Sequence, residues 1–428
     1  MAGFGDVSEG ESRLWTETER SREVAGRLVH HAIRSDMSTK TRLAKFAQRT
    51  FLAILILIPV LLYVGFSLGA RLHYADNPLA LDWDNEGPYV FFDADNALSI
   101  EYIKSNAEGG LHAERMKRPI DSPITATCHY PLDSTRFEFA IRTEFTTPPS
   151  VYDDGNRILA ISDIESNYRA LRDFLVDADV IDDDLNWTFG TGHLVLVGDF
   201  VDRGYFTTQV LWFIYKLEQD AQDQGGLVHY IIGNHELKMM HGDFGATDPK
   251  YAEVASILGR QQIDLYSSRS LLGRWMASKN AVELINGRIF VHGGLHPDLA
   301  DYGQGIEEIN QAIRQTYREP VDSTRSAQEN DLLISRETGP CWYRGYFKDD
   351  LAQEQIDRVL EKFGAEAVVV GHTLQSRVNR RHNGKVIGID VMHSNDDHKL
   401  WPEGHSEALL IDGDKYYRVL EGGKREVI

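Results

Sequence analysis

Short apolar runs recur along the chain after residue 156, and they are rich in β-branched residues. Uninterrupted apolar runs of this kind are typical of strands that are buried on both faces. Between the runs, apolar residues three and four positions apart predict helices at 167–176 and 209–217. Strands that alternate with helices indicate a parallel or mixed sheet covered by helices. The predicted strands are 157–162, 193–198, 227–233, 288–292 and 365–371.

Polar residues follow the end of each predicted strand. Because open α/β sheets bind ligands outside the carboxyl ends of their strands, we expect these residues to meet at one edge. They offer oxygen and imidazole ligands without a thiolate, a set that suits manganese, iron, zinc or magnesium. A carboxylate can also bridge two ions. The pattern therefore predicts a dinuclear metal site, with candidate ligands Asp163, Glu165, Asp199, Asn234, His292 and His372.

Residues 51–70 show a different pattern, because they are apolar and carry no charge. As a helix, a segment of this length spans about 30 Å, the thickness of a bilayer's hydrocarbon core. Lys40, Arg42, Lys45 and Arg49 precede the segment, and positive charge favours the cytoplasmic side of a membrane. We expect a single-pass helix in the cytoplasmic membrane, with the rest of the chain outside the cytoplasm, in the periplasm if there are two membranes.

Composition excludes several classes of protein. The 428-residue chain has a formal net charge of −20. This charge disfavours a nucleic-acid partner, since such a partner is bound through basic patches. The length predicts two or three folding units. Cys128 and Cys341 are too few for a disulfide framework or a thiolate zinc site, and we expect both thiols to be free.

Three ordered motifs resemble those of one enzyme family. GDFVDRG at 198–204 and GNHE at 233–236 match two signature motifs of the phosphoprotein phosphatase (PPP) family of metallophosphoesterases. HGGLHPDL at 292–299 is similar to that family's HGGLSPDL segment, with His296 in place of serine. The resemblance covers roughly residues 157–420 and is nearest to the bacterial-type Shewanella-like phosphatases. It implies a calcineurin-like β-sandwich flanked by helices.

The resemblance also implies a role for each matched residue. Asp163 and Glu165 would bind a first metal, Asp199 would bridge, and Asn234, His292 and His372 would bind a second metal, with manganese favoured. The implied reaction is hydrolysis of a phosphomonoester, from a phosphoprotein or a small phosphate, by a hydroxide that two metal ions activate. Hydrolysis of a diadenosine polyphosphate and a weakly active or non-catalytic metal-binding module are the alternatives. The remaining implied roles are phosphate binding for Arg203, Arg344 and Asn234, and proton donation for His235, oriented by Asp202.

The first metal motif departs from the family pattern. The family has GDxHG, whereas this chain has Ser162-Asp163-Ile164-Glu165-Ser166. Glu165 either serves as a ligand in a variant site or leaves the first metal position weak. Asp390, at the end of the apolar run 386–391, either supports the ligands or caps a turn. For His296, His393 and His398 we expect solvated loop positions.

The predicted organisation has four parts. Residues 1–50 form a cytoplasmic tail, partly disordered over 1–39, and residues 51–70 form the membrane helix. Residues 71–147 hold a polar linker and a small antiparallel β unit that either binds a partner or covers a sheet edge. Residues 148–428 form the catalytic domain, in which the insertion 241–280 acts as a lid or as a plain helical connection. The strands predicted in the β unit are 88–92, 97–103, 124–130 and 136–142.

Overall fold

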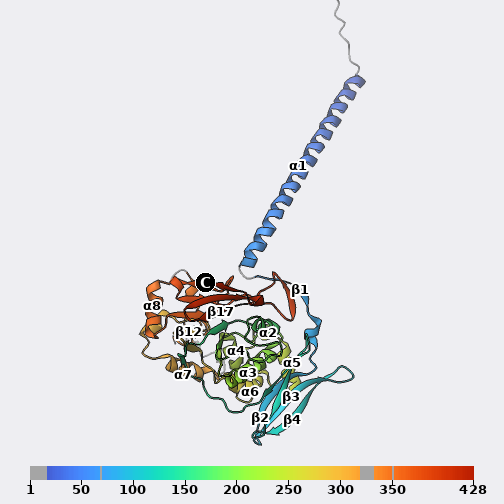
Figure 1. Cartoon of the computed structure of the whole chain (residues 1–428). Helices are drawn as coiled ribbons and strands as arrows, with labels where there is room; N and C mark the ends of the chain where they lie inside the picture. The colour runs from blue at the N-terminus through green and yellow to red at the C-terminus, as the bar shows by residue number, and fades with distance from the viewer. Residues whose placement is uncertain (1–16, 68–69, 319–331, 349–350) are drawn as a thin grey trace, which may run out of the picture. The chain divides into compact units, whose positions relative to one another are not determined.

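The computed structural model describes residues 17–67, 70–318, 332–348 and 351–428 (Figure 1). The chain divides into two compact units, residues 1–70 and residues 71–428. Each unit is described here by itself.

The N-terminal unit contains the long helix α1 (Glu17–Ser67). The partly disordered tail that was expected over residues 1–39 is wrong for residues 17–39, which are helical, whereas residues 1–16 lie outside the described part of the chain. Ion pairs one helical turn apart stabilise this polar half: Arg27 with Glu23 at 2.8 Å and Lys40 with Asp36 at 2.6 Å.

The second half of α1 carries the apolar segment. In the described ranges, α1 is the one helix long and apolar enough to cross a membrane. Its large apolar side chains from Phe51 to Val64 are all exposed. Pro59 lies inside the helix without ending it, which is common in membrane helices.

The second unit is built around two six-stranded mixed sheets that pack face to face. The sheets confirm the predicted metallophosphoesterase β-sandwich, and the five predicted strands are present as β8, β9, β10, β12 and β13. The first sheet has the order β10 (Leu227–Ile231), β9 (His193–Val197), β8 (Ile158–Ile161), β17 (Glu407–Asp412), β18 (Lys415–Leu420) and β19 (Arg425–Val427). The second has the order β14 (Asn379–Arg381), β15 (Val386–Gly388), β13 (Ala367–Val370), β12 (Arg288–Val291), β11 (Val282–Ile285) and β7 (Val151–Tyr152).

Alternating residues of the central strands face two different cores. In β8, Ile158 and Ala160 lie in the core between the two sheets, whereas Leu159 and Ile161 face the helices. Both faces are therefore buried, which explains why the sequence shows continuous apolar runs instead of alternation. The helices of the described residues are α2 (Tyr168–Asp177), α3 (Thr207–Asp223), α4 (Asn234–His241), α5 (Lys250–Leu258), α6 (Leu271–Met276), α7 (Ile306–Thr316) and α8 (Gln353–Lys362).

The small β unit is antiparallel, as expected, but it has one more strand than predicted. Its first sheet contains β2 (Glu86–Asp93), β3 (Ala97–Ser105) and β4 (Leu111–Pro119), and β5 (Thr125–Tyr130) pairs with β6 (Thr135–Ala140). The strand β4 was missed because nearly all of its residues are exposed, so it has no apolar alternation. The unit lies against the insertion 241–280 (Figure 1). Arg115 donates to the Leu258 carbonyl oxygen at 2.6 Å, and Arg260 pairs with Glu101 at 2.5 Å.

Two further features complete the unit. The strand β1 (Leu72–Asp76), which follows directly after Ala70, pairs with β16 (His398–Trp401). Both cysteines are free, as expected, and both are buried. Cys341 donates its S–H to the Ile232 carbonyl oxygen at 3.3 Å, and burial raises the pKa of its thiol, so it is not a reactive thiolate.

Candidate active site

The parallel strands of both sheets end at a common edge. Backbone hydrogen bonds join the loops that follow them: the Asp163 N–H donates to the Gly198 carbonyl oxygen at 3.0 Å, and the Gly371 N–H donates to the His292 carbonyl oxygen at 2.9 Å. The second of these links the ends of β12 and β13, and the first links the ends of β8 and β9. The strand tips thus converge as the sequence predicted.

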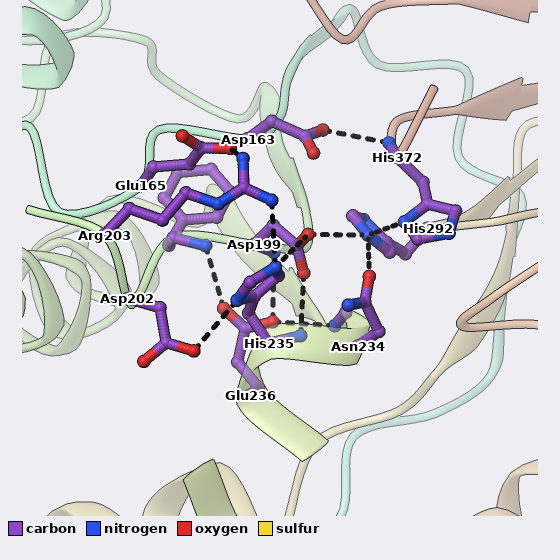
Figure 2. A network of polar contacts seen from close by, with 12 residues as sticks. Asp163, Glu165, Asp199, Asp202, Arg203, Asn234, His235, Glu236, His292 and His372 are labelled. Carbon is purple, nitrogen blue, oxygen red and sulfur yellow. Dashed lines mark hydrogen bonds and ion pairs between the residues drawn. The ribbon is translucent and has the colours of Figure 1, made fainter. Parts of the chain in front are cut away.

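Four of the expected ligands face one point (Figure 2). The Nε2 atom of His292 lies 3.1 Å from Asn234 Oδ1, 3.1 Å from His372 Nδ1 and 3.1 Å from Asp199 Oδ2. The ligand atoms of Asp199, His292 and His372 all lie within 4.8 Å of one another, and all three residues are buried. Neighbouring ligands of one ion with bonds of about 2.1 Å lie about 3 Å apart, so this spacing suits a metal ion.

The ring orientations of the two histidines support this fit. His292 donates its Nδ1–H to the Val197 carbonyl oxygen at 2.8 Å, and His372 donates its Nε2–H to the Trp342 carbonyl oxygen at 2.9 Å. When both rings are neutral, the remaining ring nitrogens turn lone pairs towards each other and towards two oxygen acceptors. These four acceptors then need a cation between them, and imidazole with carboxylate and amide oxygens suits a divalent transition metal.

The charges of these groups follow from their neighbours. Burial lowers the pKa of His372, and His292 and Arg344 add to this, bringing it to about 2. Burial also lowers the pKa of His292, but Asp199 and Asp163 outweigh it and raise the pKa to about 9. In the absence of an ion, the positive charge at this point thus belongs to His292, which pairs with Asp199.

The first motif lies on the other side of Asp199. Asp163 Oδ2 accepts the His372 backbone N–H at 3.1 Å, and Glu165 forms an ion pair with Arg203 (Figure 2). Burial raises the pKa of Glu165, although Arg203 lowers it. Glu165 is therefore close to the site but outside the compact group of Asp199, His292 and His372, and its role as a ligand stays a prediction.

His235 and Asp202 form a hydrogen-bonded pair beside the convergence point. His235 donates its Nδ1–H to Asp202 Oδ2 at 2.8 Å, and the Thr247 hydroxyl donates to Asp202 Oδ1 at 2.6 Å. The other ring nitrogen of His235 lies 3.8 Å from Asp199 Oδ2. Thr247 belongs to the insertion 241–280, so the start of this insertion is part of the site's wall.

Two guanidinium groups lie at the open side of the site. Arg203 reaches within 3.2 Å of His235 Nε2, and its side chain remains half-exposed. Arg344 is exposed and donates to the His372 carbonyl oxygen. Forked donors of this kind bind phosphoryl oxygens in pairs.

The backbone of the site is held in unusual conformations. Seven of its residues have left-handed φ angles, which cost non-glycine residues about 1 kcal/mol or more each. Two glycines permit close approach: a Cβ at Gly233 would lie 2.4 Å from Asp199 Oδ1, and one at Gly371 would lie 2.5 Å from Asp163 Oδ2. Clustered strain is typical of functional sites. The seven residues are Asp163, Glu165, Ser166, Asp199, Asp202, Arg203 and His372.

Sequence reasoning missed two residues that organise this site. Glu236 accepts backbone N–H groups from both motif loops, and its place in GNHE was an available signal. His393 was expected to be a solvated loop residue, which is wrong, because it is buried and donates to the Ser162 carbonyl oxygen at 2.9 Å. Nothing in its sequence neighbourhood indicates this contact, since the two residues lie far apart along the chain.

Comparisons with known proteins agree with this geometry. Residues 156–376, more than half of the chain, match the family model described as calcineurin-like phosphoesterase. The chain is 25% identical over 338 residues to Shewanella-like protein phosphatase 2 of Arabidopsis thaliana, covering 68% of this chain and 82% of that one. It is 27% identical over 229 residues to Shewanella-like protein phosphatase 1 of Plasmodium berghei, covering 51% and 61%.

A solved structure gives the same answer. The cold-active protein-tyrosine phosphatase of a psychrophilic Shewanella species superposes with a TM-score of 0.69 at 28% identity, over 80% of this chain and 99% of that chain. The motifs, the sandwich and the family match point to one reaction class. The chain therefore belongs to the calcineurin-like phosphoesterase family, and it is a metal-dependent phosphatase.

Proposed function

We propose that this phosphatase hydrolyses phosphomonoesters, either on a protein side chain or on a small soluble phosphate. The observation that carries the proposal is the group formed by His292 Nε2 and three ligand atoms 3.1 Å from it, which lies beside the His235–Asp202 pair and two guanidinium groups. The names of the relatives, protein phosphatase and protein-tyrosine phosphatase, support a phosphorylated protein as substrate.

The metal centre of the proposal uses the side chains of both sheets. Asp163, Glu165 and Asp199 would hold one divalent ion, and Asp199, Asn234, His292 and His372 would hold the other, with manganese favoured. When bound, such a pair of ions supplies an activated water molecule and neutralises charge on the phosphoryl oxygens.

The chain's own residues then bind and protonate the substrate. Arg203, Arg344 and the Asn234 side-chain amide bind the phosphoryl oxygens and hold the ester in line for attack. Asp202 fixes His235 with its Nδ1–H pointing away from the substrate. The Nε2 atom of His235 is then the one that carries a proton to the leaving oxygen.

The experiment compares the single variants His235→Asn and Asp202→Asn with the matched control His112→Asn. His112 is an exposed residue of β4. We expect the first two changes to lower kcat on an aryl phosphomonoester by about 10²–10⁴-fold without changing the metal content. The control should keep the kcat of the unchanged chain. An unchanged kcat in His235→Asn, or faster cleavage of a diester or a dinucleotide polyphosphate than of the monoester, would overturn the proposal.

We further propose that the apolar half of α1 anchors the enzyme in the cytoplasmic membrane, with residues 71–428 outside the cytoplasm. The support is the exposed apolar surface of α1 and the basic residues that precede it. Protease added to the outer side of intact spheroplasts should digest residues 71–428 and leave a tag at the N-terminus intact. Protection of residues 71–428 would contradict this orientation.

A further inference from the structure

One strand tip at the site's edge carries a carboxylate, Asp390, whose role the sequence left open between supporting the ligands and capping a turn. The strand β15 pairs in parallel with β13, with Gly388 opposite Val370. The pairing continues past these residues, since the Ile389 N–H donates to the Val370 carbonyl oxygen at 2.9 Å. Asp390 is two residues beyond Gly388, just as His372 is two residues beyond Val370. Asp390 therefore lies beside His372, in the loop that follows β15 at the same edge of the sheet.

The Asp390 carboxylate is buried without a partner of its own. The residue is 7% exposed. Among the described residues, hydrogen bonds reach its backbone oxygen, which accepts the Gln375 N–H at 2.8 Å, but none reaches its side chain, and no ion pair does. Buried carboxylates are almost always paired, hydrogen-bonded or bound to a metal. The alternative from the sequence, a turn cap, needs a side-chain hydrogen bond to the backbone, which is absent from this part of the chain.

The groups that surround Asp390 are the groups of the first metal position. His372, which lies beside Asp390, donates its backbone N–H to Asp163 Oδ2 at 3.1 Å, and Asp199 lies 3.1 Å from the neighbouring His292. Glu165 pairs with Arg203 and Asp199 pairs with His292, whereas in the described part of the chain no ion pair reaches Asp163 or Asp390.

The two metal positions therefore differ in chemistry. Around His292 the ligands are two imidazoles, an amide and the shared carboxylate of Asp199. On the other side of Asp199 the acidic side chains Asp163, Glu165 and Asp390 replace the imidazoles. Two divalent ions offset the charge of four carboxylates, which removes the repulsion among them.

We propose that Asp390 is a ligand of the first metal position, where with Asp163, Glu165 and Asp199 it forms an all-carboxylate site for a hard divalent cation such as Mn²⁺ or Mg²⁺. The proposal rests on the dinuclear centre of the proposed function. It also accounts for Glu165: where the family has an imidazole, this chain has a second hard ligand, and Asp390 supplies a further one. Oxygen-only sites favour Mg²⁺ and Mn²⁺ over softer ions.

The test measures metal binding to the full chain, stripped with EDTA and held in detergent. Mn²⁺, Mg²⁺ and Zn²⁺ are each titrated by calorimetry into the unchanged chain, Asp390→Asn and the matched control Asp298→Asn, whose carboxylate is exposed. We expect two Mn²⁺ sites in the unchanged chain and the control. In Asp390→Asn, one site should lose affinity by at least about 10-fold, and its preference for Mn²⁺ over Zn²⁺ should fall.

Electron paramagnetic resonance gives a second readout. The spin-coupled signal of a Mn²⁺ pair should give way to a mononuclear signal in Asp390→Asn. If this variant does not fold, Asp390→Glu replaces it. The longer side chain displaces the carboxylate, which should lower the Mn²⁺ affinity of one site and leave that of the other unchanged. Two sites of unchanged affinity and a coupled signal in the variant would overturn the role of Asp390 alone. Fewer than two sites in the unchanged chain would overturn the dinuclear centre itself.

Discussion

At the scale of single residues, Glu236 holds the two motif loops of the site together. Its Oε2 accepts the Asp199 N–H at 3.0 Å and the Gly233 N–H at 2.8 Å, while its Oε1 accepts the Phe200 N–H at 2.8 Å and the Tyr230 hydroxyl at 2.9 Å. One fully buried carboxylate thus fixes the backbone of Asp199 relative to the GNHE loop. Such a group organises the metal site without contacting an ion.

We expect Glu236→Gln to destabilise the fold and weaken metal binding. The amide N–H₂ group would face backbone N–H donors, leaving buried donors without acceptors, at a cost of about 1–3 kcal/mol. Chemical denaturation and Mn²⁺ calorimetry measure the two effects. The control is Tyr230→Phe, which removes one hydrogen bond, costs about 1 kcal/mol and leaves the Mn²⁺ affinity unchanged. Equal stability and equal affinity in Glu236→Gln would show that the carboxylate does not organise the loops.

The sequence could predict the site residues that directly follow an apolar run, because such a run marks the end of a buried strand. Asp199, Asn234, His292 and His372 each come directly after an apolar run, and motifs supply their order. Asp390 also ends an apolar run, and the sequence left its role open between supporting the ligands and capping a turn. His393 lies at the site as well, but its importance depends on which loop the tertiary fold brings against it. His393 contacts Ser162, 231 positions away, and no periodicity encodes such a distance.

At the scale of elements, prediction succeeded where burial imposes a pattern. The central strands are buried on both faces and were located to within about two residues, inside the usual error for element boundaries. The strand β4 is exposed along most of its length and was missed, although its backbone pairs along the whole of β3. Its pairing comes from backbone hydrogen bonds, which every sequence can make.

The small β unit is joined to the rest of the domain by a buried ion pair. Lys250 of α5 lies 2.9 Å from Glu86 of β2, and both side chains are almost fully buried. Burial raises the pKa of Glu86, but Lys250, Gln209 and Tyr89 outweigh it and hold the pKa below its usual value. The stabilisation from Glu86 is therefore present above about pH 4.5 and is lost as the pH falls below it.

We expect Lys250→Met to lower the free energy of unfolding by about 3–5 kcal/mol at pH 7, because it leaves a buried charge uncompensated. The double change Glu86→Gln with Lys250→Met should recover part of this loss. Denaturation curves measure both, and Lys117→Met is the control, since Lys117 is exposed and water screens its pair with Asp93. A loss in Lys250→Met no larger than in the control would contradict the role of the pair.

At the scale of the whole molecule, the second unit begins at a residue that forms a hydrogen bond near the site. Arg71, the first residue of the second unit, donates to the His393 carbonyl oxygen at 3.2 Å. His393 in turn donates to Ser162, the residue before Asp163. The chain directly after the apolar helix is thus tied to the first metal motif. A chain shortened up to Arg71 should therefore differ from a chain shortened just beyond it.

We expect a chain that begins at Arg71 to leave the membrane fraction but to keep the kcat and the melting temperature of the detergent-solubilised full chain. A chain that begins at Pro78 loses Arg71 and the β1–β16 pairing as well. Its melting temperature should be several degrees lower and its Mn²⁺ affinity weaker, because the support of the Ser162 loop is gone. Sedimentation, thermal melting and calorimetry compare the full chain with the two shortened chains. A loss of kcat in the chain that begins at Arg71 would mean that α1 contributes to catalysis. Equal melting temperatures and equal Mn²⁺ affinities of both shortened chains would remove any role for Arg71.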